Sequence, residues 1–131
     1  MSEGEDFILY REESHEIMGC AFSVYNHLGS GFLEAVYQEA LEMELQEKGI
    51  PFVSQKEIDI YYKGKPLSKK YIADIIVDDK IILELKSVSN LTAVDSAQII
   101  NYLKATGTEH GMLINFGSEK FQCRKIARTY R

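Results

Sequence analysis

Three charged residues interrupt two otherwise apolar segments near the middle of the chain. Asp74 lies in the segment 72–77, and Glu84 and Lys86 lie in the segment 81–86. Both segments are rich in isoleucine, leucine and valine, which is typical of strands buried in the centre of a sheet. Two carboxylates and an amine on such strands have the chemistry to bind a divalent cation and to act on a phosphate.

The turn between these two segments decides whether the carboxylates meet. Asp74 and Glu84 lie opposite each other in only one antiparallel register. That register pairs Val77 with Ile81 and leaves 78–80 as a three-residue loop. A two-residue turn would send the carboxylates to opposite faces of the sheet. We therefore predict a three-residue loop or a compensating bulge.

The two carboxylates would repel each other if the strands brought them together. At a separation of about 4 Å the repulsion is about 1 kcal/mol in water and about 4 kcal/mol at an effective dielectric constant near 20. A divalent cation removes this cost. Mg²⁺ is the expected ion, with Mn²⁺ as a substitute, because Mg²⁺ binds one or two protein carboxylates and fills its other positions with water and phosphate oxygens.

Lys86 completes this group on the same strand face as Glu84. Its ammonium would orient an attacking water and offset negative charge on the phosphate oxygens. The alternative is that Glu84 and Lys86 simply face solvent above a core of Leu83 and Leu85. The spacing of Asp74, Glu84 and Lys86 leaves both interpretations open.

Two predicted helices carry further polar side chains at helical spacing. Gln98 and Tyr102 lie four residues apart, on one side of the helix that follows the strands. Glu34 and Tyr37 lie three residues apart near the start of an earlier helix. Each has an ordinary alternative, with the tyrosines at the rim of the core and Glu34 as an acid favoured in a first helical turn.

The elements that would position these residues follow from hydrophobic spacing and turn residues. We expect, in order, a helix over 13–28, a helix from Leu33 that ends by Gly49, and antiparallel strands near 52–62, 67–77 and 80–88. A further helix, capped by Thr92 and ending at Gly107, precedes a strand over 111–116. The residues after that strand fit either a short helix or an edge strand.

Length and composition indicate one globular domain over 1–131, with a loosely ordered N-terminus over 1–11. No apolar run approaches the roughly 20 residues that cross a bilayer, so we expect a cytoplasmic protein without membrane contact. Cys20 and Cys123 are expected as reduced thiols.

The histidines and cysteines show no spacing of a zinc motif, so no zinc site is expected. The three histidines, His15, His27 and His110, are expected at the surface or in packing contacts.

The charge distribution limits how the chain could meet nucleic acid. A net charge of −5 argues against a protein that coats nucleic acid through charge alone. The last seventeen residues nevertheless contain only Glu119 as an acid, against the basic residues Lys120, Arg124, Lys125, Arg128 and Arg131. This segment is either a local basic surface or an ordinary solvated face.

The segment 31–37 carries the pattern G-x-x-E-x-x-Y. With this motif the chain resembles the GxxExxY proteins, a group of small domains assigned to the PD-(D/E)XK nuclease superfamily. The resemblance covers about residues 12–128 and includes the segments 71–74, 84–86 and 101–117, together with Gln98 and Tyr102.

The resemblance implies an α/β (α+β) fold of the restriction-endonuclease type. Its αβββαβ core would hold a mixed central sheet flanked by helices, with one extra N-terminal helix. Asp74, Glu84 and the backbone carbonyl of Leu85 would bind the metal, and Lys86 would be the catalytic lysine. Ala73 stands where the superfamily pattern has proline, a position without metal contact.

The same resemblance gives roles to residues of the two helices. Glu34 would approach the metal directly or through water. Gln98 and Tyr102 would position the substrate or water on the metal, and Gly31 and Tyr37 would belong to the motif that positions substrate.

Two functions compete for this chain. The first is a Mg²⁺-dependent nuclease that hydrolyses phosphodiester bonds, with DNA expected rather than RNA. The second is a catalytically silent domain of the same fold that binds nucleic acid or a protein. Retention of Asp74, Glu84 and Lys86 favours the enzyme, because a silent member need keep none of them. A domain this small would need a partner or a second copy, as in a homodimer, to hold a long duplex firmly.

Overall fold

Two packed helices precede the sheet. The computed structural model describes residues 11–127, and in it helix α2 (Arg11–Leu28) packs against helix α3 (Glu34–Glu47). Both helices were predicted to within two residues at each end. The predicted loose N-terminus over 1–11 lies outside the described residues, apart from Arg11, which begins α2.

Five strands form one sheet in the order β1-β2-β3-β4-β5. The strands are β1 (Phe52–Tyr62), β2 (Lys65–Val77), β3 (Ile81–Lys86), β4 (His110–Asn115) and β5 (Gln122–Ala127). Strands β3 and β4 run parallel and all other neighbours run antiparallel, so the sheet is mixed, as predicted. Of the two alternatives for the C-terminal segment, the edge strand is the correct one.

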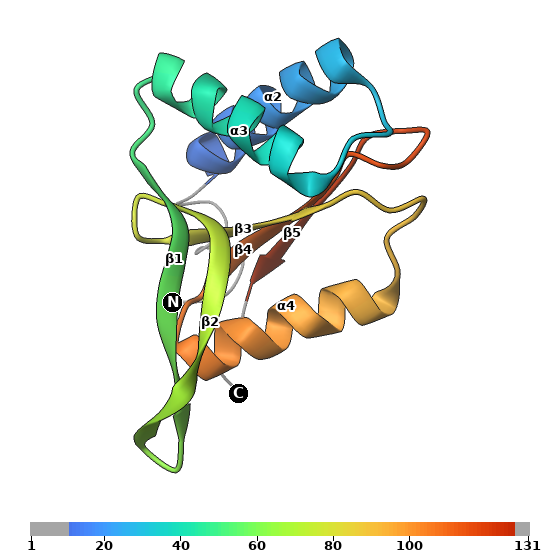
Figure 1. Cartoon of the computed structure of the whole chain (residues 1–131). Coiled ribbons are helices and arrows are strands. Elements are labelled where there is room, and N and C mark those ends of the chain that lie inside the picture. Colours follow the sequence, from blue (N-terminus) through green and yellow to red (C-terminus); the bar gives the residue numbers. More distant parts are fainter. Residues whose placement is uncertain (1–10, 128–131) are drawn as a thin grey trace.

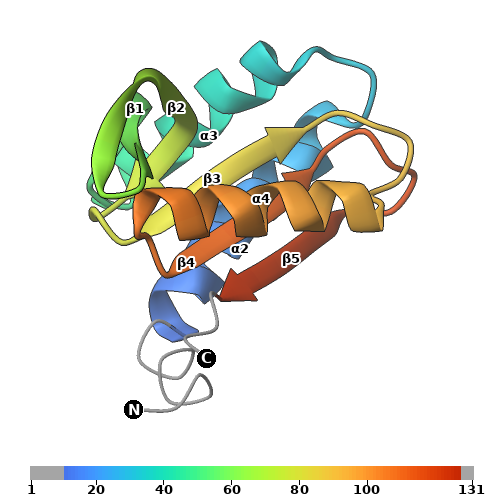
Figure 2. The ribbon, with the colours of Figure 1, turned by 90° about the horizontal axis from the view of Figure 1, so that it is seen from below.

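Helix α4 (Ala93–Thr106) connects the parallel strands and lies on the face of the sheet opposite α2 and α3 (Figures 1 and 2). The backbone N–H of Thr92 donates to Asp95 Oδ2 at 2.9 Å and caps the helix, as predicted. Gly107 ends the helix with a φ of 77°, a conformation that glycine adopts without strain. The fold is therefore the expected α+β type, with α2 added before an αβββαβ core.

Each face of the sheet buries its own apolar core. The larger core lies under α2 and α3 and includes Ile17, Leu41, Ile75, Leu83 and Leu85. The smaller core lies under α4 and includes Tyr71, Ala73, Ile82, Ile99 and Leu103. Because side chains alternate along a strand, β3 contributes to both cores, which explains its almost continuous apolar sequence.

The β2–β3 hairpin has the predicted register. Val77 pairs with Ile81, and the paired residues end at Ile75 and Leu83. The three-residue loop between the strands is therefore confirmed. The two predicted carboxylates come next, directly beyond the last pair.

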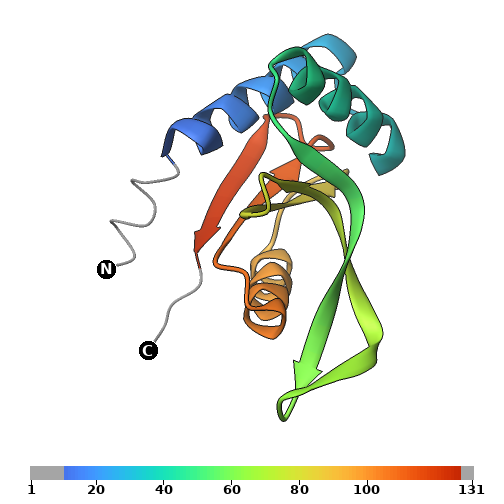
Figure 3. The same ribbon diagram turned by 90° about the vertical axis from the view of Figure 1, so that its left-hand side faces the viewer.

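Strands β1 and β2 continue past the sheet as a long two-stranded ribbon. Figure 3 shows this ribbon projecting from the rest of the described chain, with its turn at the far end. Within residues 11–127, no helix has both the length and the apolar character to span a membrane.

Candidate active centre

Asp74 bridges β2 and β3 at the point where their backbone pairing stops. Its Oδ2 accepts a hydrogen bond from the backbone N–H of Leu85 at 2.8 Å. Desolvation raises the pKa of Asp74, and the nearby Glu34 raises it further. The Leu85 N–H and the Lys86 ammonium lower this pKa and offset part of the effect. Asp74 is therefore a partly buried carboxylate with both a positive and a negative side chain nearby.

Glu84 is the second carboxylate of the site. Its Oε1 accepts a hydrogen bond from the hydroxyl of Tyr71. Burial raises the pKa of Glu84 to about 7, although the hydrogen bond from Tyr71 lowers it. Asp74 raises this pKa further, and Lys86 lowers it. A carboxyl with this pKa is partly protonated at neutral pH, and a bound cation would stabilise its ionised form.

Lys86 ends β3 beside these carboxylates. It is partly buried, and its charge lowers the pKa of both Asp74 and Glu84. The backbone N–H of Phe116 donates to the Lys86 carbonyl at 2.9 Å, which fixes the end of the strand. The burial of Glu84 and its hydrogen bond from Tyr71 argue against the alternative in which this side chain simply faces solvent, whereas Lys86 stays partly exposed.

Tyr71 links Glu84 to helix α4, a role that sequence reasoning did not assign. Its ring stacks on the ring of Tyr102, with centroids 4.1 Å apart and planes inclined by 17°. Burial and the neighbouring carboxylates raise the pKa of Tyr71, so its hydroxyl stays protonated and donates to Glu84. The only signal in the sequence was the position of Tyr71 in the segment 71–74.

Helix α4 brings its two predicted site residues to different surroundings. Tyr102 packs behind Tyr71 and so reaches Glu84 only through that ring. Gln98 is exposed, and its side chain makes no hydrogen bond to another residue between 11 and 127. A direct contact of either residue with substrate stays a prediction.

The predicted motif over 31–37 forms a tight loop that leads into α3. The Tyr37 hydroxyl donates to the carbonyl of Gly29 at 2.6 Å and accepts the N–H of Phe32 at 3.2 Å. Its ring is fully buried and stacks on Phe116 with centroids 4.6 Å apart. Gly31 has a φ of 116°, which strongly favours glycine. Tyr37 therefore shapes the loop from inside the core, and any effect on substrate would pass through the loop.

Glu34 lies at the rim of a cleft beside the site. It is exposed in the first turn of α3, close enough to Asp74 to raise its pKa. The cleft has a volume of about 350 Å³ and is lined by residues 30–34 and 87–89 and by Gly117. The Ser87 hydroxyl donates to the carbonyl of Phe32 at 2.7 Å and ties the two walls together.

Gln38 is a second residue that sequence reasoning missed. Its Nε2 donates to the backbone carbonyl of Asp74 at 3.0 Å and to Glu42 Oε2 at 2.9 Å. It therefore holds the backbone that carries the first carboxylate. Its position four residues after Glu34, on the same side of α3, was the available signal.

The residues of the site fit a hard divalent cation. Within the described part of the chain, no three His, Cys, Asp or Glu side chains form a group that could hold a metal ion. The available donors are instead the two carboxylates of Asp74 and Glu84 together with backbone oxygen, which is the oxygen-only set that Mg²⁺ prefers. Burial is the main cause of the raised pKa of both carboxyls, and a bound cation would favour their ionised forms.

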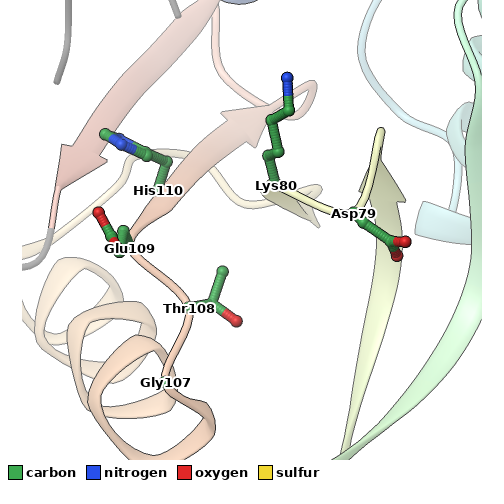
Figure 4. A pocket seen from close by; sticks show the side chains of 6 residues that line it. All are labelled: Asp79, Lys80, Gly107, Thr108, Glu109 and His110. Atoms are coloured by element: carbon green, nitrogen blue, oxygen red, sulfur yellow. The ribbon is translucent and has the colours of Figure 1, made fainter.

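A separate hollow lies at the other end of β3 and β4 and contains none of the predicted site residues. It has a volume of about 220 Å³, and the residues that line it are Asp79, Lys80, Gly107, Thr108, Glu109 and His110 (Figure 4).

Comparison with known proteins gives a family and a fold. A family model described as PD-(D/E)XK nuclease superfamily matches residues 11–128. No curated protein matches the chain. The crystal structure of SSO0001 aligns with a TM-score of 0.58 and 21% identity, covering 95% of this chain and 62% of that one.

A second solved structure is more distant. The crystal structure of an alkaline exonuclease (LHK-Exo) from Laribacter hongkongensis aligns with a TM-score of 0.43 and 15% identity, covering 67% of this chain and 52% of that one. The chain thus spans less than two thirds of the length of either solved structure.

Proposed function

Because this chain belongs to the PD-(D/E)XK nuclease superfamily, we propose that it hydrolyses phosphodiester bonds of nucleic acid, with DNA as the substrate. The observation that supports the proposal is a pair of partly buried carboxylates, Asp74 and Glu84, which follow the last β2–β3 pair, with Lys86 near enough to lower the pKa of both. A pair of this kind costs stability unless it serves a cation.

We assign the metal site to the oxygen atoms that these strands present. Asp74, Glu84 and the Leu85 carbonyl would hold Mg²⁺, with Mn²⁺ able to substitute, and Glu34 is a candidate for a further contact. When bound, the ion offsets the charge of the carboxylates and of the phosphate and promotes the ionisation of water.

The protein groups then have separable tasks in the hydrolysis, in which one P–O ester bond breaks and a water oxygen bonds to phosphorus. The Leu85 N–H and the Tyr71 hydroxyl hold Asp74 and Glu84 in place. Lys86 offsets the negative charge that develops on the phosphate oxygens. We keep substrate positioning as the proposed role of Gln98 and Tyr102, and of Gly31 and Tyr37 through their loop.

Three further assignments belong to this proposal. The motif over 31–37 supports membership of the GxxExxY group within the superfamily. Location in the cytoplasm and function as a homodimer are proposed on the sequence arguments given above.

The rival function is a silent domain that binds nucleic acid or a protein without cutting. The acidic net charge of −5 is the observation that favours it. The raised pKa of Glu84 favours the enzyme, since a silent domain has no need for a partly buried pair of carboxylates.

Cleavage assays with labelled duplex and single-stranded DNA test the proposal. In Mg²⁺ or Mn²⁺, we expect the Lys86→Ala variant to cut roughly 100-fold more slowly than the wild type, because it loses charge stabilisation at the phosphate. Lys48→Ala, at an exposed position after α3, is the matched control and should cut at the wild-type rate.

Two outcomes would contradict the nuclease. Equal cleavage by wild type and Lys86→Ala would remove Lys86 from the mechanism and point to a contaminating activity. Binding of DNA with no cleavage in either metal would favour the silent domain.

A further inference from the structure

The turn of the β1–β2 hairpin concentrates positive charge in an acidic chain. Residues 61–70, called the hairpin arm below, contain no acid and four lysines: Lys63, Lys65, Lys69 and Lys70. The whole chain has a net charge of −5. The arm therefore presents a local positive field to any polyanion that approaches it.

Three of these lysines are free to meet a ligand. Every residue of the arm is exposed. Lys70 forms an ion pair with Asp59. No acidic side chain between residues 11 and 127 lies within ion-pair distance of Lys63, Lys65 or Lys69.

The arm also exposes large apolar and aromatic side chains. Tyr61 is 52% exposed, Tyr62 is 60% exposed and Leu67 is 41% exposed. The Lys63 ammonium lies over the ring of Tyr62, 5.4 Å from its centroid. Lysines alone could serve to keep a bare strand edge from pairing with other chains. Exposed tyrosines serve no such purpose, and tyrosine beside lysine is typical of surfaces that contact nucleic acid.

One continuous strand joins the arm to the active centre. Lys69 precedes Asp74 by five residues and Lys65 precedes it by nine. At about 3.3 Å per residue, these lysines lie up to about 17 Å and about 30 Å along β2 from Asp74. Figures 1 and 3 show the arm extending beyond the rest of the described chain, where a long ligand could lie against it.

This separation suits a stiff ligand. Duplex DNA rises about 3.4 Å per base pair, so the arm lies on the order of five to nine base pairs from the active centre. A duplex hardly bends over that length, since its persistence length is about 150 base pairs. It can therefore contact both places at once, and a two-stranded ribbon has a width that the major groove admits.

The C-terminal basic segment is a weaker candidate surface. The Arg124 guanidinium donates to Ser96 Oγ at 2.7 Å and to the Thr92 carbonyl at 3.1 Å, so it is engaged inside the structure. Arg128 and Arg131 lie outside the described residues.

We propose that the hairpin arm grips the phosphate backbone of duplex DNA while Asp74 and Glu84 face the phosphodiester that is cut. The inference rests on the proposed function, because it takes the polyanion to be the substrate of that centre. Lys63, Lys65 and Lys69 supply the charge, and the two tyrosines contact sugars and groove edges.

A triple variant with Lys63→Gln, Lys65→Gln and Lys69→Gln tests the arm in the full chain. Binding to a duplex of about 20 base pairs is measured by fluorescence anisotropy without divalent ions, so that no cleavage occurs. We expect at least about tenfold weaker binding near 0.1 M salt. The slope of log K against log salt should fall by about 2.7, because each phosphate contact contributes about 0.9.

The matched control removes the same charge from exposed positions elsewhere: Lys48→Gln, Lys120→Gln and Lys125→Gln. It should bind the duplex almost as the wild type does, and both triple variants should keep the wild-type Tm. A single-stranded oligonucleotide of equal length should show a clearly smaller penalty for the arm variant than the duplex does.

The outcomes separate the arm from the nuclease. The proposal that the hairpin arm binds DNA would be wrong if the arm variant kept the wild-type affinity and salt slope, or if the control variant lost as much affinity. Either result would leave the nuclease proposal standing. If the arm variant lost equal affinity for the duplex and for the single strand, duplex DNA would not be the specific ligand of the hairpin arm. Loss of binding in the arm variant of a chain that cuts in neither metal would support the arm and reject the nuclease. Failure of the wild-type chain to bind the duplex would contradict the proposed role of the hairpin arm.

Discussion

Burial, more than the number of charges, sets the chemistry of Glu84. The carboxyl is held against the Tyr71 hydroxyl beside Asp74, and its pKa rises to about 7. The folded chain therefore stabilises the neutral form of a group that the proposed metal needs in its ionised form. Metal binding and proton loss at Glu84 should be coupled.

The first prediction concerns stability without a divalent ion. We expect the free energy of unfolding to fall as the pH rises from 4.5, the ordinary pKa of a glutamic acid, to about 7, the pKa of Glu84 in the folded chain. Over this range the folded state keeps a proton that the unfolded state has lost, so rising pH favours unfolding. The contribution is at most about 3 kcal/mol, and Glu84→Gln should lack it. Urea unfolding at several pH values measures both.

Mg²⁺ provides the complementary measurement. Its stabilising effect on the wild type should grow as the pH rises through about 7, because the ionised carboxylates bind the cation. Glu84→Gln should show a small Mg²⁺ effect at every pH. A wild-type pH profile identical to that of Glu84→Gln would show that burial does not raise this pKa.

At the scale of elements, the side chains of strand β2 change from one face of the sheet to the other at the candidate active centre. Tyr71 and Ala73 belong to the core under α4, whereas Ile75 and Val77 belong to the core under α2 and α3. A regular strand would send all four side chains to one face. The change falls at Asp74 and turns Tyr71 towards Glu84.

A second element meets the site through a close backbone contact. Gly117, after β4, packs on the backbone of Ser87 and Val88, just beyond the end of β3. A Cβ at Gly117 would lie 2.4 Å from Val88 N, so the backbone would have to move. We expect Gly117→Ala to lose about 1–3 kcal/mol of stability, as overpacked sites do. It should also lose cleavage activity, because the shift would displace Lys86.

Gly19→Ala is the matched control for this substitution. Gly19 lies inside α2, and a Cβ there would meet nothing within 4 Å. Alanine should stabilise the helix by up to about 1 kcal/mol and leave cleavage unchanged. Urea unfolding and the cleavage assay separate the two variants. A Gly117→Ala variant as stable and active as Gly19→Ala would show that the contact with Val88 is easily relaxed.

At the scale of the whole molecule, one sheet belongs to both cores. Ile82 and Leu83, adjacent on β3, are fully buried in different cores. Loss of either helical layer would expose one face of β3 to water. The two layers are therefore expected to depend on each other.

We accordingly predict that residues 1–131 unfold as a single domain. Far-ultraviolet circular dichroism and tyrosine fluorescence should give coincident thermal transitions, since the chain has eight tyrosines and no tryptophan. Calorimetric and van't Hoff enthalpies should agree. Two separated transitions would show that the α4 layer unfolds independently of α2 and α3.

The sequence by itself determined the features that depend on near neighbours. The helix bounds follow from apolar spacing, the start of α4 from the cap at Thr92, and the register of β2 and β3 from their three-residue loop. Each of these rests on interactions within a few residues, whose geometry the chain fixes locally. The positions of Asp74 and Glu84, directly beyond the last β2–β3 pair, were therefore predictable.

Only the tertiary structure decided which distant side chains meet. The hydrogen bond from Tyr71 to Glu84, the support of Asp74 by Gln38 and the stacking of Tyr37 on Phe116 were all absent from the sequence argument. The first contradicts simple strand alternation, and the others join segments that no local rule connects. Such contacts depend on the twist of the sheet and the packing of helices on it, which many residues set together.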